Sequence, residues 1–514
     1  MVITMQLGVQ LQSIGGAVSD YLDHHANDHS NSHVSNVGSS SERYPSMVQP
    51  TPQLMPNPDN YALLTDLYQL TMGACYDHQG IADKPAAFEL FVRRLPEGFS
   101  YGVAMGLAMA LEYLENLYFS PELIAKIQGL GVFRQAPASF WQRLAGASGK
   151  TWFTGNVWAM PEGTLFSANE PLLRIEAPLW QAQLVETYLL NTLNYQSLIA
   201  TKAARLRDQA GDHVTLLEFG TRRAFAPQGA LWAARAALAA GFDATSNVWA
   251  ALQLGREPSG TMAHALVMAL TAQGESELTA FEAFHELFPH SPLLIDTFDP
   301  VRAMQTLGAS TIGATVAGVR IDSGDVLALA HESRRYLPQA RVFVSGDIDE
   351  AEIARLKSAN APIDGYGVGT KLVTGAPVNG VYKLVELDGQ PVVKHAAGKS
   401  TYAGKKQVFR HIDATGMITG DRLGLMTEPP LDGEQPLLEL VMTNGKRQKD
   451  DDSLEVIAQR VRQSVQALPS QYRNLDPDLD RNLDRNLEHV NILPVAVSDG
   501  VLALTAQALG RHLG

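Results

Sequence analysis

The sequence predicts an α/β protein in which an irregular TIM-type (β/α) barrel packs with an α+β domain built from the N- and C-terminal segments. Two patterns carry this prediction. Between residues 206 and 375, short apolar runs typical of strands alternate with longer runs of helical periodicity, which implies parallel strands joined by crossover helices. On either side, short strands separated by turns are mixed with helices. The number of strand–helix units favours a barrel over an open doubly wound sheet.

The barrel strands are expected in the segments VTLLEFG, ATSNVWAAL, GTMAHALVMAL, PLLIDTF, GATVAGVRIDSG, ARVFVSGDID and IDGYGVGTKLV. Helices are expected between them at 229–241, 327–337 and 350–359, where apolar residues recur with helical spacing.

By pattern, the chain divides into four parts. Residues 1–57 are rich in Ser, Asn, His, Pro and Asp, which predicts a flexible extension. Residues 58–205 are predicted to form the α+β N-terminal domain, and residues 206–375 the barrel that holds the site. Residues 376–514 return to hairpin-like strands and are predicted to pack on the N-terminal domain.

Within the N-terminal domain, four elements stand out. A helix is expected at 62–80, and 86–94 alternates apolar and polar residues as a strand does. Several short strands are expected within 150–178, separated by Pro-Glu-Gly and Asn-Glu-Pro turns, and one long helix at 181–209.

Composition excludes several classes of protein. The formal net charge is −14, which disfavours a nucleic-acid-binding surface. The single cysteine cannot form an internal disulfide and gives no sign of an oxidising compartment. No stretch reaches the roughly 18–20 apolar residues of a membrane span, and the first residues lack the basic region of a signal peptide. We therefore expect a cytoplasmic enzyme that does not bind membranes.

Polar residues collect where the predicted strands end, which is where a TIM-type barrel keeps its reactive groups. Arg222, beside a second arginine, could hold a carboxylate or phosphate, although such pairs more often form surface salt bridges. Thr261 and His264 lie in GTMAH, where a lone histidine is usually structural. Asp296 directly follows an apolar run and could fix an imidazole tautomer or cap a helix.

The densest polar group is RIDSGD, where strand alternation puts Arg320 and Asp322 on one face and suits a small polar substrate. Two glycine turns follow, and late turns of this kind cradle phosphate in such barrels. A lysine cluster further on indicates a polyphosphate partner or a solvated basic loop. From these segments we assign to the site Gly346, Asp347, Gly369, Thr370 and Lys405. The residues alone thus predict a barrel enzyme for a small, anionic, phosphorylated substrate.

Taken in order, the motifs resemble those of the nicotinate phosphoribosyltransferase family. The resemblance covers roughly residues 60–460. The segments that carry it are ALLTDLYQLTM, FELFVRRLP, MPEGTLFSANEPLLRI, LVETYLLNTLNYQSLIATKAAR, EFGTRRA, GFDATSNVWA, GTMAHALV, LLIDTFD, VRIDSGD, GVGTKLVT and GKSTYAGKKQVFR.

The resemblance implies a type II phosphoribosyltransferase fold and a homodimer. It implies that nicotinate and phosphoribosyl pyrophosphate give nicotinate mononucleotide and pyrophosphate, coupled to ATP hydrolysis, in NAD salvage. The family phosphorylates the histidine of this motif, so His264 is the expected phosphohistidine, with Asp296 accepting a hydrogen bond from its ring. Mg²⁺ is expected to enter through the polyphosphate rather than through a dedicated protein site.

The resemblance also implies roles at the substrates. Tyr68 is expected to stack on the pyridine ring from across the dimer interface, with Phe219 on the opposite face. Arg320 is expected to pair with the nicotinate carboxylate, near Thr261. The other residues expected to bind substrate are Arg222, which contacts the base or its phosphate, Asp322, and the group on the ribose and phosphates formed by Gly346, Asp347, Gly369, Thr370 and Lys405.

Three alternatives stay open. A nicotinamide or quinolinate phosphoribosyltransferase would share the fold and phosphate loops, although the arginines favour a base that carries a carboxylate. A non-catalytic barrel that acts as a binding module would not need His264 and Asp296. An unrelated sugar-phosphate enzyme would not need Tyr68.

Overall fold

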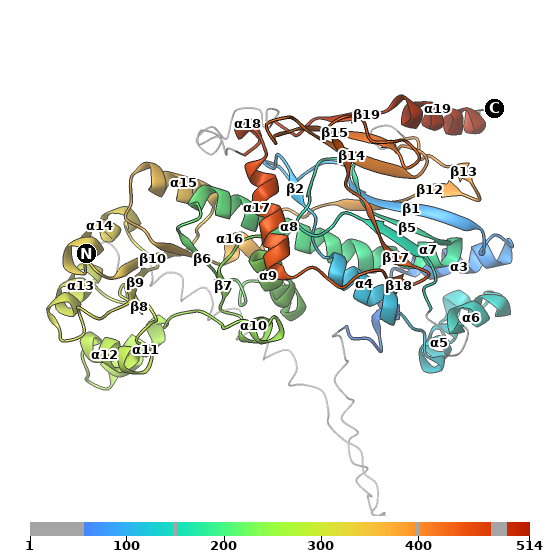
Figure 1. Ribbon diagram of the computed structural model, residues 1–514. Coiled ribbons are helices and arrows are strands. Elements are labelled where there is room, and N and C mark those ends of the chain that lie inside the picture. The colour runs from blue at the N-terminus through green and yellow to red at the C-terminus, as the bar shows by residue number, and fades with distance from the viewer. Residues whose placement is uncertain (1–55, 147–151, 397–399, 474–490, 514) are drawn as a thin grey trace, which may run out of the picture. The chain divides into compact units, whose positions relative to one another are not determined.

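The computed structural model describes residues 56–146, 152–396, 400–473 and 491–513 (Figure 1). All but the last two residues of the predicted extension lie outside this range, and so do residues 480–487, which repeat the sequence Asp-Arg-Asn-Leu.

One half of the fold is built on a seven-stranded sheet with the order β13-β12-β1-β5-β3-β17-β18. Strands from the N-terminal segment form its centre and strands from the C-terminal segment form both edges, so neither segment forms the whole sheet alone. Its strands are β1 (Pro85–Val92), β3 (Asn156–Ala159), β5 (Pro171–Pro178), β12 (Gly380–Leu387), β13 (Gln390–Pro391), β17 (Glu439–Thr443) and β18 (Lys446–Arg447). The alternation in β1 predicts one solvent-facing side, yet both sides are buried and Glu89 is 0% exposed. A cation covers that carboxylate, as described below.

Helices and two smaller sheets surround this half. The long helix expected at 181–209 is divided at Val185 into α7 and α8. Cys75, the chain's single cysteine, is exposed on α3. The helices are η1 (Tyr61–Leu63), α3 (Leu67–His78), α4 (Leu107–Asn116), α5 (Pro121–Gln128), η2 (Gly131–Phe133), α6 (Ala138–Ala145), α7 (Leu179–Leu184), α8 (Glu186–Ala210), α17 (Leu454–Gln466), α18 (Ser470–Arg473) and α19 (Asp499–Leu513). The smaller sheets contain β2 (Gly102–Val103) with β4 (Leu165–Phe166), and β14 (Lys406–Ile412), β15 (Ile418–Leu425), β16 (Glu434–Pro436) and β19 (Val495–Val497).

The other half is a six-stranded parallel sheet with the order β7-β6-β11-β10-β9-β8 (Figure 1). Its strands are β6 (Thr215–Glu218), β7 (Ala244–Thr245), β8 (Leu293–Leu294), β9 (Gly318–Ile321), β10 (Arg341–Ser345) and β11 (Gly365–Val368). Its helices are α9 (Pro227–Ala239), α10 (Val248–Gln253), α11 (His264–Ala272), α12 (Glu277–Leu287), α13 (Pro300–Ala309), α14 (Val326–Tyr336), α15 (Glu350–Ser358) and α16 (Thr370–Val373).

The α/β class is confirmed, but a closed barrel is not. In the described residues, β7 and β8 are the edges of the sheet, and no ladder of hydrogen bonds joins them. The strand expected in GTMAHALVMAL was wrong, because α11 begins at His264. Its run of Ala, Leu and Met favours a helix, and periodicity alone does not separate a short buried helix from a strand.

The parallel sheet is covered on both faces, which is why its strands are apolar almost throughout. Leu293, Val319, Ile321 and Val342 are each 0% exposed and form one core cluster. Helix α8 packs against α9 and α15 beside the parallel sheet and against β12 of the antiparallel sheet. It therefore links the two halves.

Candidate functional site

The carboxyl ends of β8, β9 and β10 are joined by two aspartates. Asp296, which follows β8, accepts hydrogen bonds on Oδ2 from the backbone N of Asp322 at 2.8 Å and from Oγ of Ser323 at 2.7 Å. Asp322, which follows β9, in turn accepts a hydrogen bond from the hydroxyl of Ser345 at the end of β10. The residues that the sequence places on separate strands are thus held together at one edge.

Arg320 brings a positive charge to the same edge. Burial lowers the pKa of its guanidinium, while the carboxylates of Asp322 and Asp296 raise it and Arg222 lowers it further. Strand alternation correctly placed Arg320 beside Asp322. Its Nε atom is buried and has no hydrogen-bond partner among the described residues, and the same holds for Oδ1 of Asp296. The site thus holds one buried donor and one buried acceptor without a hydrogen-bond partner. Buried polar groups without a partner lower the stability of the fold unless a ligand forms the missing hydrogen bonds.

His264 does not contact Asp296 as expected. Its Nδ1 atom lies 3.1 Å from Oγ1 of Thr297, and the only hydrogen bonds that Asp296 accepts among the described residues come from the loop after β9. Thr297 therefore contacts the histidine, while Asp296 bonds to the loop after β9 at the sheet edge.

Phe219 lies in a space that two glycines leave open. A Cβ atom on Gly367 would come within 2.4 Å of the Phe219 ring, and one on Gly369 within 3.2 Å of its carbonyl oxygen. Gly369 precedes Thr370, the first residue of α16. Gly367 and Gly369 therefore leave the space that Phe219 occupies. Their predicted contact with phosphate is a separate role.

The turn after β10 packs on the loop after β9. Gly346 has a φ of +87°, and a Cβ atom there would lie 2.4 Å from the carbonyl oxygen of Asp322, so that only glycine fits. Asp347 follows with a φ of +51°, a conformation that aspartate tolerates better than most residues. Arg222 is exposed, and Thr261 makes one long hydrogen bond of 3.5 Å to the carbonyl oxygen of Met262.

Tyr68 belongs to a second polar group, on the antiparallel half. It is 45% exposed on α3, and burial and the Glu186 carboxylate raise its pKa. Burial lowers the pKa of Lys383, Glu186 opposes that shift, and Arg93 and Lys394 add to it. This basic group was not predicted from the sequence. The paired arginines after the apolar strand of FELFVRR, the same signal as in EFGTRR, could have revealed it.

Arg93 is the residue of this second group that lacks hydrogen-bond acceptors. Its Nε and Nη2 atoms are buried and have no hydrogen-bond partner among the described residues. A buried guanidinium without an acceptor is a candidate for binding an anion.

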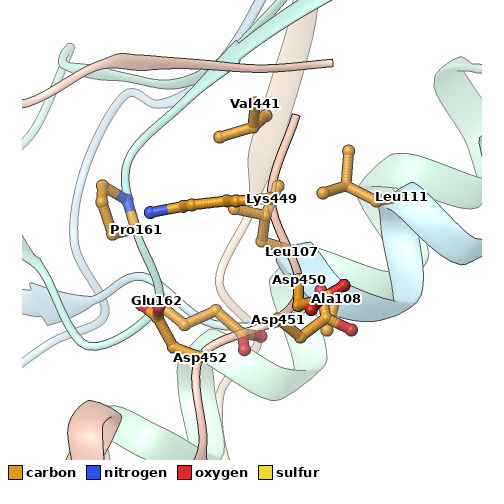
Figure 2. A pocket seen from close by; sticks show the side chains of 10 residues that line it. All are labelled: Leu107, Ala108, Leu111, Pro161, Glu162, Val441, Lys449, Asp450, Asp451 and Asp452. Atoms are coloured by element: carbon orange, nitrogen blue, oxygen red, sulfur yellow. The ribbon is translucent and has the colours of Figure 1, made fainter. Parts of the chain in front are cut away.

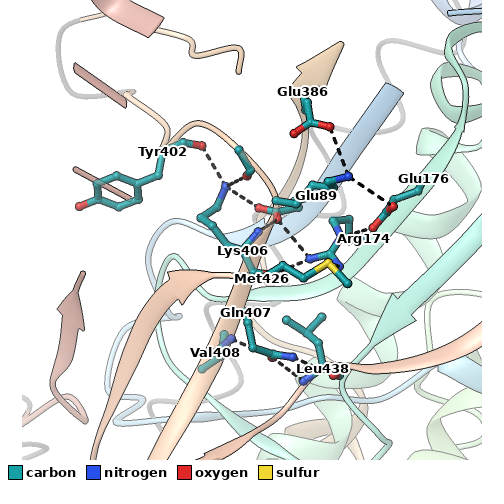
Figure 3. Close-up of polar contacts among 12 residues, drawn as sticks. Glu89, Arg174, Glu176, Glu386, Tyr402, Lys406, Gln407, Val408, Met426 and Leu438 are labelled. Carbon is teal, nitrogen blue, oxygen red and sulfur yellow. Dashed lines mark hydrogen bonds and ion pairs between the residues drawn. The ribbon is translucent and has the colours of Figure 1, made fainter. Parts of the chain in front are cut away.

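Lys405 lies on the antiparallel half, and its assignment to phosphate stays a prediction. Its Nζ atom is 3.3 Å from Glu386 and 3.7 Å from Glu176. The next residue, Lys406, is buried, with its Nζ atom 2.7 Å from Oε2 of Glu89 (Figure 3). These lysines neutralise carboxylates of the antiparallel sheet, so the cluster that looked basic in sequence is compensated in space.

Replacing Lys406 by alanine should lower the free energy of unfolding by about 3 kcal/mol, because buried Glu89 would lose its close cation and keep only Arg174, whose Nη1 lies 4.0 Å from Oε1. Lys405→Ala removes a more exposed, solvent-screened charge and should cost less than about 1 kcal/mol. Urea denaturation of both variants measures the difference. Equal losses would contradict this account, and a loss of phosphoribosyl pyrophosphate binding in Lys405→Ala would support the phosphate role.

Two cavities lie away from the strand ends. One, of about 30 Å³, is bordered by α4 and the run Asp450–Asp452 (Figure 2) and has room for about one water molecule. The other, of about 430 Å³, lies between α8, α9 and α17. Neither is lined by the residues assigned to the site.

In the described part of the chain, no three His, Cys, Asp or Glu side chains are grouped so as to hold a metal ion. None of the helices in that part has the length and apolar character of a membrane span.

Paired carboxylates, an unpaired arginine and glycine turns at the ends of parallel strands define an α/β enzyme for small anionic substrates. Residues 63–194 match the nicotinate phosphoribosyltransferase (NAPRTase) N-terminal domain, and residues 214–347 match the NAPRTase family. The chain belongs to the nicotinate phosphoribosyltransferase family and is an enzyme of this kind.

Individual relatives agree. A nicotinate phosphoribosyltransferase of Mycobacterium tuberculosis is 40% identical over 464 residues, which are 88% of this chain and 94% of the relative. That of Bacillus subtilis is 43% identical over 390 residues, 72% of this chain and 77% of the relative. The crystal structure of human nicotinic acid phosphoribosyltransferase superposes with a TM-score of 0.72 at 28% identity and covers 86% of this chain and 99% of that one.

Proposed function

We propose that the enzyme transfers a phosphoribosyl group from phosphoribosyl pyrophosphate to nicotinate, with coupled ATP hydrolysis, in NAD salvage in the cytoplasm. The observation that carries the proposal is the unpaired Nε of Arg320 close to the two fixed aspartates. A guanidinium matches a planar carboxylate in two parallel hydrogen bonds. Nicotinate supplies that carboxylate, and nicotinamide does not.

In this proposal the protein positions and stabilises charge instead of attacking the sugar. Arg320 and Phe219 orient the pyridine nitrogen towards C1 of the ribose, and Thr261 and Asp322 border the base. The turns at Gly346–Asp347 and Gly369–Thr370 hold the ribose and its 5′-phosphate. As pyrophosphate leaves, C1 gains positive character and the ring nitrogen captures it. Mg²⁺, bound through the polyphosphate, supplies charge neutralisation.

His264 is the proposed site of phosphorylation. In the tautomer whose Nδ1–H donates to Thr297, Nε2 keeps its lone pair and can accept a phosphoryl group. A phosphate there adds negative charge at the sheet edge. Asp296, whose Oδ1 has no partner among the described residues, stays free for a hydroxyl or N–H donor.

We further propose that the active unit is a homodimer in which the two polar groups come from different subunits. Tyr68 and the basic group at Arg93 and Lys383 lie on the antiparallel half, and Arg320 and His264 lie on the parallel half. The parallel half also carries exposed apolar residues: Phe225, Val248, Trp249, Leu252 and Phe298 are 58–79% exposed. A patch of this kind marks an interaction surface, and a two-fold dimer would complete both sites at once.

The substrate is tested by assaying nicotinate, nicotinamide and quinolinate, each with phosphoribosyl pyrophosphate and with or without ATP. Nicotinate should be turned over fastest and be stimulated by ATP. Arg320→Ala should raise the KM for nicotinate at least about tenfold, as expected for a lost charge-assisted pair. A preference of the wild-type enzyme for either other base would overturn the proposal.

The phosphohistidine is tested with a matched pair of histidines. His264→Ala should retain turnover without ATP but lose its stimulation by ATP, because the phosphoryl acceptor is gone. His285, whose Nε2 also lies 3.1 Å from a threonine hydroxyl, provides the control, and His285→Ala should be stimulated normally. Incorporation of labelled phosphate from ATP follows the same pattern. Stimulation that survives in His264→Ala would show the assignment to be wrong.

Sharing of the site between subunits is tested by complementation. Tyr68→Ala and Arg320→Ala should each be nearly inactive at low nicotinate concentration. After the two variants are mixed and allowed to exchange subunits, activity should return to about a quarter of wild type, since half of the dimers then hold one intact site. A mixture that stays inactive while heterodimers are detected by mass spectrometry would contradict a shared site.

A further inference from the structure

Glu218 is a buried carboxylate that the proposed reaction does not use. It is the last residue of β6 and is 0% exposed. No cation lies within ion-pair distance of it among the described residues, and burial raises its pKa. A buried acid without a cation costs stability, so its presence at the edge of the site calls for a functional reason.

Both carboxylate oxygens are occupied by hydrogen-bond donors. Oε1 accepts the backbone N–H of Gly220, and Oε2 accepts the hydroxyl of Thr245 at the end of β7. The Thr245 oxygen already accepts the backbone N–H of Asn247 at 3.0 Å. Its proton is therefore directed to Glu218, and a carboxylate, which only accepts, matches both donors.

These bonds hold the loop that carries Phe219 and Arg222. Gly220, fixed by Glu218, receives the backbone N–H groups of Arg223 at 2.7 Å and of Ala224 at 3.0 Å on its carbonyl. A Cβ atom on Gly220 would lie 2.8 Å from Glu218 and 2.2 Å from Val373, so the carboxylate and the loop are in close contact.

The same bonds reach the segment that leads to His264. The carbonyl of Thr245 accepts the backbone N–H of Ser259 at 2.9 Å, and Ser259 is followed by Gly260 and Thr261. Through Thr245, Glu218 thus connects the loop after β6 with the segment before α11.

We propose that Glu218 is a positioning residue for nicotinate: its carboxylate keeps the Phe219 ring and Arg222 in a fixed place relative to the segment before His264. This inference rests on the proposed role of Phe219 at the base. Glutamine at position 218 would present an amide N–H₂ to one of two donors, so one bond is lost with little change in volume.

The test compares steady-state constants of Glu218→Gln, Thr245→Val and Thr245→Ser. Glu218→Gln and Thr245→Val should raise the KM for nicotinate about tenfold and leave the KM for phosphoribosyl pyrophosphate within about twofold of wild type. Each variant loses one charge-assisted hydrogen bond that orders the loop after β6. Thr245→Ser keeps the hydroxyl and should behave as wild type. If Glu218→Gln does not fold, the two threonine variants carry the test.

A double-mutant cycle separates positioning from a general loss of stability. If Glu218 acts through Phe219, adding Glu218→Gln to Phe219→Ala should change the KM for nicotinate less than about twofold further. Glu170→Gln is the control, because Glu170 is also 0% exposed and accepts a backbone N–H, from Ser167 at 2.7 Å, in the other half. It should lower thermal stability and leave both KM values unchanged.

Additive effects in the cycle, or equal changes in both KM values, would overturn the inference while the proposed function stands. A Phe219→Ala enzyme with an unchanged KM for nicotinate would instead overturn the assignment of Phe219, and this inference with it.

Discussion

Hydrogen bonds to two carboxylates, Asp296 and Asp322, hold the edge on which the site depends. They join the ends of β8, β9 and β10. The backbone pairing of β9 with β10 ends at Ile321 and Val344, so it does not hold the loops that follow. Without these bonds, Arg320 would lack its anionic neighbours and the Gly346 turn would lose the surface on which it packs. Positioning of substrate groups requires loops that do not relax, and side-chain hydrogen bonds supply that rigidity here.

Much of the parallel half could be predicted from the sequence because its strands are buried on both faces and appear as continuous apolar runs. The segments around Glu218, Arg320, Ser345 and Val368 are strands as expected. The segment at His264 was not, because a short apolar run does not distinguish helix from strand. Closure of the sheet was also beyond the sequence, since it depends on pairing between distant strands that local patterns do not encode.

The residues assigned to the candidate site were chosen from sequence motifs, but motifs do not give the contacts of those residues. Arg320 and Asp322 share a face because strand alternation is a local property. The partner of His264 is Thr297 instead of Asp296, and Lys405 is neutralised by Glu176 and Glu386, which lie more than two hundred and fewer than twenty residues away respectively. Such long-range partners decide whether a charged residue is available to a ligand. Sequence motifs therefore identified the family more securely than the role of each side chain.

The exposed thiol of Cys75 has a practical consequence. It lies seven residues after Tyr68 on α3, which is two helical turns and about 10 Å along the same face. Because the chain has no other cysteine, a spin label or fluorophore attached there marks one spot per subunit, without any engineered substitution. Distances between two such labels would report directly on how the face bearing Tyr68 is arranged in an assembly, and on whether substrates change that arrangement.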